Sequence, residues 1–416
     1  MRTYKIYTLG CKVNQYDSGK LAAELQAAGL ISAAKNADLA VINSCAVTKT
    51  AIIKSGRVVK LAGKENPKAK IAVIGCAKEM IDKIFNFQFS IFKKNKSHDL
   101  VTTDRARYFI KIQDGCEQFC SYCVIPYTRG RLKSRAEAEV ICEIEQAVKA
   151  GFREIILSGI HLGLYGKPSQ LSLREAPATK QSPVNRNKPE ITSFPSVARN
   201  DNLTSLLKKL IKIKKLGRIR LSSIEITEVT DELIKLMKRS RKICRHLHIP
   251  LQAGRDSVLK RMNRPYTIKN YELRIKEIRK AVPDIAISTD VIVGFPGETE
   301  KDFRDTVKFI KQIKFSRLHV FPFSAHERTP AFKMPNQVDE KTKKRRAELL
   351  RKLNLKLMAD YKKKFKNKEL EIVMEQIKGD KILGKSEYYF DVEVEKKKLK
   401  NTKIKIGEII KIRNPL

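Results

Sequence analysis

Short apolar runs of strand length alternate with helical patterns along most of the chain, and this alternation constrains the fold more than any other feature. Near the N-terminus, runs at 4–9, 39–43 and 70–74 are separated by helical spacing of apolar residues at 18–30 and 48–61. Strands that alternate with helices form parallel sheets with right-handed crossovers. We therefore predict an α/β fold that begins with a parallel, Rossmann-like βαβ domain.

A second series of strand and helix patterns follows from residue 108. Six units are too few to close an eight-stranded barrel, so we predict an open, partial β/α barrel whose site lies at the C-terminal ends of its strands. Helical spacing is clearest at 140–148, 233–237, 273–278 and 303–313. The strands are expected at Tyr108–Ile112, Glu154–Leu157, Arg218–Ser222, His246–Pro250, Ala286–Val293 and Arg317–Phe321.

The last part of the chain has a different pattern. Residues 341–368 carry 13 basic and 2 acidic residues with helical spacing, which suits either a solvated face or a linker that faces RNA. Short β-type runs then alternate with turn residues, which predicts a small C-terminal β-barrel of the kind that binds nucleic acid. These runs lie at 370–374, 388–394, 402–406 and 409–412.

These patterns predict three domains, at 1–100, 101–340 and 341–416. The middle domain contains an unusual segment at 166–202, which holds five of the 15 prolines and has no periodicity. Such a composition is typical of a disordered surface loop. We expect this segment to protrude from the barrel.

The charge balance indicates a polyanionic partner. The chain has 86 basic and 45 acidic residues, a net charge of +41. Neutralising phosphates with lysine and arginine releases counterions, so nucleic acid is the simplest partner. Composition alone also allows an alternative in which the excess of basic residues only keeps the protein surface soluble and binds no partner.

The cysteines and the hydropathy indicate a reducing compartment. No apolar run reaches the roughly 20 residues that cross a bilayer, and the first 15 residues lack the three parts of a signal peptide. We expect no membrane partner and a cytoplasmic location, where thiols stay free for metal or redox chemistry.

Three cysteines directly follow the three predicted strands of the N-terminal domain. They are Cys11, Cys45 and Cys76, here called the N-terminal triad. The carboxyl ends of parallel strands meet at one edge of the sheet, where open α/β sheets bind ligands. We therefore expect these three thiols to form one site.

A second group of three cysteines follows the first strand of the predicted barrel. Cys116-Glu-Gln-Phe-Cys120-Ser-Tyr-Cys123, here called the barrel triad, can place three thiolates around one cluster face. Three ligands leave the fourth iron of a 4Fe-4S cluster open, whereas a closed cluster uses four. Zinc is the alternative metal, but a structural zinc site needs a fourth Cys or His, and none follows within 15 residues.

A CxxxCxxC loop after the first strand of a partial β/α barrel resembles that of the radical S-adenosylmethionine (SAM) enzymes. The flanking sequence from Lys111 to Arg131, with the N-terminal triad upstream, resembles the methylthiotransferase family over nearly the whole chain. The segments Thr8-Leu-Gly-Cys-Lys-Val-Asn-Gln-Tyr-Asp-Ser18 and Asn43-Ser-Cys-Ala-Val-Thr48 are most similar to the branch that acts on threonylcarbamoyladenosine in tRNA. The sibling branches carry different residues around the first two cysteines.

The resemblance implies a tRNA-modifying enzyme that adds a methylthio group at C2 of N6-threonylcarbamoyladenosine. Its barrel would be a radical SAM core, and its C-terminal barrel a TRAM domain. The barrel triad would hold a 4Fe-4S cluster that binds and cleaves SAM, and the N-terminal triad a second 4Fe-4S cluster involved in sulfur transfer. The partners would be the tRNA anticodon stem-loop and an electron donor.

The resemblance also implies four SAM contacts. Ser158 and Gly159 follow the second barrel strand at the place of the SAM amino group, and Gln252 stands where a polar residue meets the ribose. The turn from Asp290 to Glu298, with Gly294, resembles the glycine-rich turn beneath the adenine. No catalytic residue beyond the cluster ligands is predicted.

Two other functions are compatible with these patterns: methylthiolation of isopentenyladenosine in tRNA, and a non-catalytic, basic RNA-binding protein with structural metal. The remaining cysteines and histidines are interpreted mainly as structural. We expect Cys142 on the apolar face of a helix, Cys244 buried as a small hydrophobe, and His246 and His248 along a strand. His161 follows a strand end, so we expect it near the site without assigning it a role.

Overall fold

The computed structural model describes residues 2–85, 105–169, 202–398 and 405–414. The predicted insert at 166–202 and the segment that joins the first two domains therefore lie largely outside the described residues. In the described part of the chain, no helix combines the length and apolar character needed to cross a membrane.

The N-terminal part is a parallel α/β sheet, as predicted. Its strands are ordered β2-β1-β3-β4 and all of its pairings are parallel. The two-residue strand β2 was not predicted, because both of its residues are exposed and it has no apolar pattern. The elements are β1 (Thr3–Thr8), α1 (Lys12–Ala27), β2 (Ile31–Ser32), β3 (Leu39–Ser44), α2 (Lys49–Glu65), β4 (Lys70–Gly75) and α3 (Lys78–Phe85).

The middle part is an open arc of six parallel strands, which confirms the partial barrel. Two sheets, β5-β8-β9 and β10-β11-β12, are joined by parallel bridges from Ile219 to Ile243 and from Ser223 to His248. The strands are β5 (Tyr108–Lys111), β8 (Glu154–Ser158), β9 (Arg218–Leu221), β10 (His246–His248), β11 (Ala286–Val293) and β12 (Arg317–Pro322). A short ribbon pairs β6 (Gln113–Asp114) with β7 (Lys133–Ser134).

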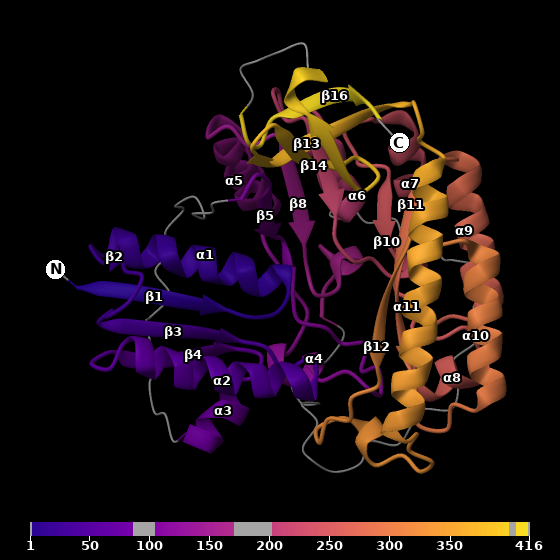
Figure 1. Cartoon of the computed structure of the whole chain (residues 1–416), viewed down its shortest axis with the longest axis horizontal. Coiled ribbons are helices and arrows are strands. Elements are labelled where there is room, and N and C mark those ends of the chain that lie inside the picture. The colour runs from indigo at the N-terminus through magenta and orange to yellow at the C-terminus, as the bar shows by residue number, and fades with distance from the viewer. Residues whose placement is uncertain (1, 86–104, 170–201, 399–404, 415–416) are drawn as a thin grey trace.

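Helices cover the outside of this arc (Figure 1). Several of them begin where a Thr or Asn side chain accepts a hydrogen bond from a backbone N–H of the first turn, as Thr299 does from Asp302 in a capping box. The helices are α4 (Ile125–Arg129), α5 (Glu137–Lys149), α6 (Leu203–Leu210), α7 (Asp231–Arg239), α8 (Asp256–Arg261), α9 (Ile268–Ala281) and α10 (Glu300–Ile313), with short 3₁₀ turns at Leu162–Leu164, Ile226–Glu228 and Pro330–Phe332.

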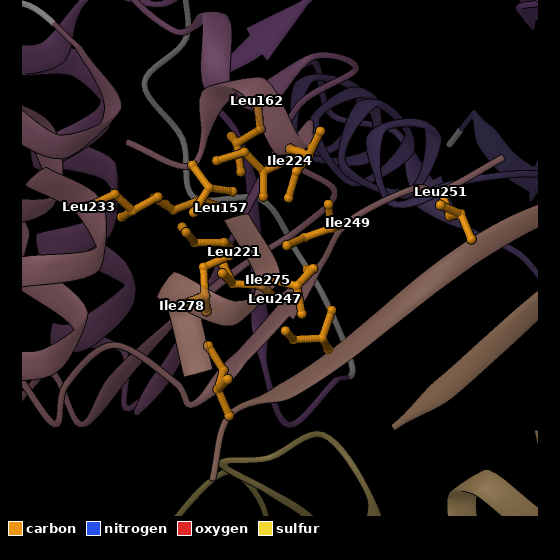
Figure 2. Packing of buried hydrophobic residues seen from close by; sticks show 14 of the residues in the cluster. Leu157, Leu162, Leu221, Ile224, Leu233, Leu247, Ile249, Leu251, Ile275 and Ile278 are labelled. Carbon is orange, nitrogen blue, oxygen red and sulfur yellow. The ribbon is translucent and has the colours of Figure 1, made fainter. Parts of the chain in front are cut away.

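A continuous apolar core lies between the strands of the arc and their helices. Figure 2 shows part of it, where Leu157, Leu221 and Leu247 from three strands meet Ile275 and Ile278 of α9. All five side chains are at most 1% exposed. This core fixes the strand ends on which the cysteine loops are mounted.

The basic segment forms the long helix α11 (Glu340–Lys363), which lies beside β12 (Figure 1). Not all of its cations face solvent. Lys343 and Arg346 are buried, and Arg346 donates to the Glu298 carboxylate at 2.7 Å. The interpretation of the whole segment as a solvated or RNA-facing surface is therefore wrong for these two residues.

The C-terminal part is a curled antiparallel sheet of order β15-β14-β13-β16, which forms half a barrel. Strand β14 was not predicted. The expected strand at 402–406 falls partly outside the described residues, and Lys405 and Ile406 are not in a strand. The elements are β13 (Glu369–Lys378), β14 (Lys381–Ser386), β15 (Asp391–Glu395), a 3₁₀ turn at Lys396–Lys398 and β16 (Ile409–Arg413).

Two arginines join this sheet to the barrel. Arg218 donates to the carbonyls of Glu371 and Lys385, both at 2.7 Å, and Arg220 donates to the carbonyl of Ser386 at 2.9 Å. Because β9 carries both arginines, the sheet covers the end of the barrel at which the strands begin (Figure 1). The opposite end, where the strands finish, carries the cysteine loops.

Candidate active site

The N-terminal triad lies on three loops at one edge of the first sheet, as predicted. Cys11 is the residue before α1, and Cys45 and Cys76 directly follow β3 and β4. Gly10 allows the first two loops to meet, because a Cβ at Gly10 would lie 3.1 Å from the Cys45 Sγ. The Asn14 side chain holds the same loops together by donating to the carbonyls of Leu9 and Ser44.

The barrel triad lies in the loop after β5 and β6. The Cys116 N–H donates to the carbonyl of Gly130 at 3.1 Å, and the Cys123 N–H donates to that of Cys120 at 2.9 Å. Gly115 is required here, since a Cβ would lie 1.8 Å from the Arg131 carbonyl oxygen. The loop is therefore folded tightly back on itself.

Backbone strain occurs in this loop and beside it. Phe119 has φ 47° and Gln252 has φ 63°, which are unfavourable for residues with a side chain. Asn263 donates to the Phe119 carbonyl at 3.0 Å and so holds the strained turn in place. Such conformations persist where the surrounding structure imposes them, commonly at ligand sites.

Each cysteine triad has an arginine on one of its sulfur atoms. The Arg264 Nη1 lies 3.3 Å from the Cys120 Sγ, and the Arg129 Nε lies 3.1 Å from the Cys76 Sγ. Arg264 also pairs with Glu225. A guanidinium beside a thiol stabilises negative charge on the sulfur.

Arg129 links the N-terminal triad to the loop that carries the barrel triad. It belongs to α4, six residues after Cys123, yet its Nη1 binds Asp114 of the barrel at 2.9 Å while its Nε reaches Cys76 of the first sheet. Its Nη2 also contacts Asn14, which braces the N-terminal triad. One side chain therefore connects the two cysteine sites across the boundary between the two sheets.

His161 contacts the barrel triad directly. Its Nδ1 lies 3.4 Å from the Cys116 Sγ, and its Nε2 lies 2.5 Å from Glu228. Burial lowers the pKa of His161, but the Glu228 carboxylate and Cys116 outweigh burial and raise this pKa well above its usual value. The expectation that His161 lies near the site is confirmed.

The buried thiols are protonated in the absence of metal. Burial raises the pKa of Cys45, Cys76 and Cys120, and it raises that of Cys123 to about 12. Arg264 opposes this effect at Cys120. Since thiolates bind metal, occupancy of either triad must release protons.

The donor chemistry of both triads fits an iron–sulfur cluster. Three cysteine sulfurs of each triad share one short loop or one sheet edge, and hydrogen bonds to sulfur are one of the means by which proteins tune such clusters. Among the described residues, no group of three or more His, Cys, Asp or Glu side chains is arranged so as to hold a metal ion. The six cysteines are among these residues, so the fit rests on the type of the donor atoms and on the loops that carry them, not on a preformed metal geometry.

The four predicted SAM contacts lie at the ends of barrel strands. Ser158 ends β8, and Gln252 hydrogen-bonds through its backbone to β11. Gly159 leaves space for Gln113, because a Cβ there would lie 2.9 Å from the Gln113 Oε1. Gly294 has φ 72°, and Lys343 fills the space where its side chain would be, so local packing by itself requires this glycine.

The remaining predictions for cysteine and histidine have mixed outcomes. Cys244 is buried, as expected. Cys142 is exposed, so its assignment to the apolar face was wrong: Val140 and Ile144 of α5 face the core, and Cys142 between them faces solvent. His246 and His248 lie on β10 as predicted.

Sequence reasoning did not identify Arg129, Arg264, Glu225 or Glu228 as site residues. Arg129 had a local signal, because it stands in the Tyr-Thr-Arg-Gly-Arg segment directly after the barrel triad. Arg264 and the two glutamates are distant along the chain, and only the folded barrel brings them to the cysteines.

Comparison with known proteins agrees with this geometry. Residues 110–310 match the Radical SAM superfamily, and residues 3–101 match "Uncharacterized protein family UPF0004". A threonylcarbamoyladenosine tRNA methylthiotransferase, MtaB, of Bacillus subtilis is 36% identical, and the match covers 99% of this chain and 94% of that protein. The MtaB of Thermotoga maritima is 34% identical, with 94% and 90% covered.

The chain belongs to the radical SAM tRNA methylthiotransferase family. Radical SAM enzymes require SAM and a 4Fe-4S cluster, and methylthiotransferases with the UPF0004 domain carry a second cluster, so the expected cofactors are confirmed.

Two further matches concern the alternative substrate and the fold. A tRNA-2-methylthio-N(6)-dimethylallyladenosine synthase of a Thermoanaerobacter species is 32% identical, with 90% of this chain and 82% of that protein covered. Among solved structures, the radical SAM methyltransferase TsrM of Kitasatospora setae matches with a TM-score of 0.53 at 13% identity, with 80% of this chain and 77% of TsrM covered. The TsrM match supports the fold alone.

Proposed function

We propose that this enzyme adds a methylthio group at C2 of N6-threonylcarbamoyladenosine next to the anticodon of tRNA. The observation that carries this proposal is the pair of cysteine triads, with Arg129 bridging Cys76 of one triad and Asp114 just before the other, which suits a reaction that needs two clusters. The names of the relatives at 34–36% identity favour threonylcarbamoyladenosine, while the 32% identical synthase represents the dimethylallyl alternative.

Six cysteines would hold the two clusters. Cys116, Cys120 and Cys123 would bind the SAM-cleaving cluster, and the N-terminal triad would bind the second. SAM bound at the first cluster supplies radical chemistry able to remove hydrogen from an unactivated carbon, and it also supplies the methyl group. Ser158, Gly159, Gln252 and Gly294 would contact SAM from the strand ends.

Side chains around the two triads set the charge near the sulfur atoms and hold the site residues in place. Arg264 and Arg129 oppose the rise in pKa that burial causes at Cys120 and Cys76, so they ease the loss of the thiol protons when metal binds. His161 is fixed between Glu228 and Cys116, which orients its ring toward the barrel triad.

The rest of the chain would hold the anticodon stem-loop. Domains at 1–100, 101–340 and 341–416 would supply the second cluster, the radical SAM core and the TRAM-like RNA-binding sheet. Lysines rim a groove between α10 and α11, where the phosphate backbone can release counterions (Lys311, Lys314, Lys352, Lys356 and Lys364). An electron donor must reduce the first cluster. An enzyme that modifies tRNA would work in the cytoplasm.

Cys120→Ala tests the assignment of the barrel triad. The reconstituted variant should lose production of 5′-deoxyadenosine from SAM, while its affinity for tRNA stays within about twofold, because Lys and Arg elsewhere make the phosphate contacts. The measurements are chromatography of the SAM products and a filter-binding titration. Continued production of 5′-deoxyadenosine would refute the assignment.

Cys45→Ala tests the second triad in the same assay. This variant should still cleave SAM but should form no methylthio product on a tRNA that carries threonylcarbamoyladenosine. Cys142→Ala is the matched control, because Cys142 is exposed and belongs to neither triad. Iron and sulfide should fall from about eight each to about four each in Cys45→Ala. An unchanged product yield would disprove a role for the second cluster.

A further inference from the structure

The interior of the barrel holds a set of polar side chains that the reaction above does not use. The Ser288 hydroxyl lies 2.8 Å from the His246 Nε2 and 2.9 Å from the His248 Nδ1. The His248 and His319 rings meet edge to face at 5.4 Å. Because these residues alternate along β10, β11 and β12, they share the inner face of the arc.

The carboxylates near this interior are already paired. Glu154 binds Arg218 and Arg220 at 2.6 and 2.7 Å. Asp290 lies 3.2 Å from the His248 Nε2. Glu154 is therefore neutralised by its own arginines, and Asp290 already has a partner in His248.

Lys12, the first residue of α1, brings a further cation into this interior. It follows Cys11 directly, and its Nζ lies 5.8 Å from the centroid of the Tyr389 ring. The Tyr389 ring stacks on the His246 ring, with the two centroids 4.4 Å apart. The Arg220 Cζ lies 5.1 Å from the centroid of the Tyr389 ring. In the part of the chain that the structure describes, the Lys12 ammonium has no ion-pair or hydrogen-bond partner.

The surroundings of Lys12 favour an anion. Burial raises the pKa of Tyr389, but the charges of Lys12, Arg107, Lys385 and Arg220 outweigh burial and bring this pKa below its ordinary value. Tyr389 also has φ 71°, so the loop that closes the barrel holds the ring in a strained backbone conformation. The surroundings of Lys12 are not sealed from solvent, because His248, Asp290, His319 and Tyr389 are all partly exposed.

We propose that Lys12 is a specificity-determining residue that binds the carboxylate of the threonylcarbamoyl group. This inference rests on the proposed function. The threonylcarbamoyl group ends in a carboxylate, whereas a dimethylallyl group is apolar and offers nothing to an ammonium ion. Lys12 directly follows Cys11 of the N-terminal triad, and its side chain runs into the barrel interior toward Tyr389. A base placed between the triads would therefore have to extend its N6 substituent into this interior to reach the Lys12 Nζ.

Binding of three synthetic anticodon stem-loops tests the proposal. The loops carry threonylcarbamoyladenosine, its methyl ester and isopentenyladenosine, and the protein is the reconstituted holoenzyme with SAM but without reductant, so nothing turns over. Lys12→Gln should weaken binding of the carboxylate loop roughly tenfold to a hundredfold, the range for a hydrogen bond to a charged group. Binding of the ester and isopentenyl loops should stay within about twofold.

Two further variants control the measurement. Lys12→Arg keeps the positive charge and should retain most of the preference for the carboxylate, while Lys20→Gln on the same helix should change nothing. Iron content and melting temperature verify that each variant is folded and loaded. Equal weakening of all three loops by Lys12→Gln, or no weakening of any, would overturn the proposal.

Turnover separates this inference from the function on which it rests. If the unsubstituted enzyme methylthiolates the threonylcarbamoyl loop but Lys12→Gln binds it equally well, only the role of Lys12 is refuted. If the unsubstituted enzyme modifies only the isopentenyl loop, the proposed function itself is refuted.

Discussion

Glu154 is a fully buried carboxylate that balances two buried guanidinium groups. It is 0% exposed, and Arg218 and Arg220 are 1% and 0% exposed. Breaking a buried ion pair leaves uncompensated charge, which costs about 3–5 kcal/mol. We predict that Glu154→Gln lowers the free energy of unfolding by about this amount at pH 7, as measured by urea titration, and that exposed Glu348→Gln changes it by less than about 0.5 kcal/mol.

The same residue predicts a pH dependence. Burial raises the pKa of Glu154, but Arg218, Arg220 and Arg107 outweigh burial and hold it at about 2, below the ordinary value of 4.5. Since the folded-state pKa is depressed, this stabilisation is complete above pH 4.5 and is lost as the pH falls toward 2. The stability gap between the unsubstituted enzyme and Glu154→Gln should therefore narrow between pH 7 and pH 3.5. A constant gap would contradict the ion-pair account.

At the same scale, sequence patterns identified the cysteines but not the residues that act on them. Consecutive strand ends and the CxxxCxxC spacing are local signals, so both triads could be named from the chain alone. Arg264 reaches Cys120 from a distant loop, and Lys12 lies under Tyr389 only because the C-terminal sheet folds over the barrel. No local pattern encodes such long-range proximity.

Helix α11 has two faces with different roles. Lys352, Lys356 and Lys363 are exposed. Changing all three to Gln should lower the slope of log affinity for tRNA against log salt by about 0.9 for each duplex phosphate that these lysines no longer neutralise. The melting temperature should not change. Filter binding at several salt concentrations measures the slope, and an unchanged slope would exclude this face from the RNA surface.

Substitution on the inner face of α11 should lower stability and leave the salt dependence of tRNA binding unchanged. Arg346→Met leaves Glu298 buried without its partner, so unfolding should become easier by about 3–5 kcal/mol. The salt dependence of tRNA binding by the folded variant should stay the same. Thermal unfolding and the same binding titration measure both effects, and Arg345→Met, an exposed neighbour, is the matched control.

Helices and strands were predictable wherever their apolar residues recur with a clear helical or strand spacing. The six barrel strands lie within a few residues of their expected places, and Ala286–Val293 matches fully. Strand β14 has no such pattern, since its sequence mixes Lys with Gly384. A Cβ at Gly384 would lie 2.8 Å from the Val373 carbonyl oxygen, so close pairing of β14 with β13 requires glycine here. The same glycine interrupts the apolar pattern by which a strand is predicted.

Across the whole molecule, the C-terminal sheet closes one end of the barrel and the N-terminal sheet lies against its side (Figure 1). The junction with the C-terminal sheet depends on hydrogen bonds from Arg218 to the carbonyls of Glu371 and Lys385. In Arg218→Met, we expect the amides of β13 and β14 to exchange hydrogen faster than those of β11. Hydrogen-exchange mass spectrometry measures this difference. Equal protection of the two regions in the variant would contradict the coupling, and exposed Arg241→Met is the control.

The central claim is that this chain methylthiolates threonylcarbamoyladenosine in tRNA by means of both cysteine triads. The most direct test is mass spectrometry of tRNA nucleosides from cells without the protein, with it, and with its Cys45→Ala variant. We predict that methylthio-threonylcarbamoyladenosine appears only with the unsubstituted protein. If methylthio-isopentenyladenosine changed instead, or if neither nucleoside changed, the claim would be contradicted.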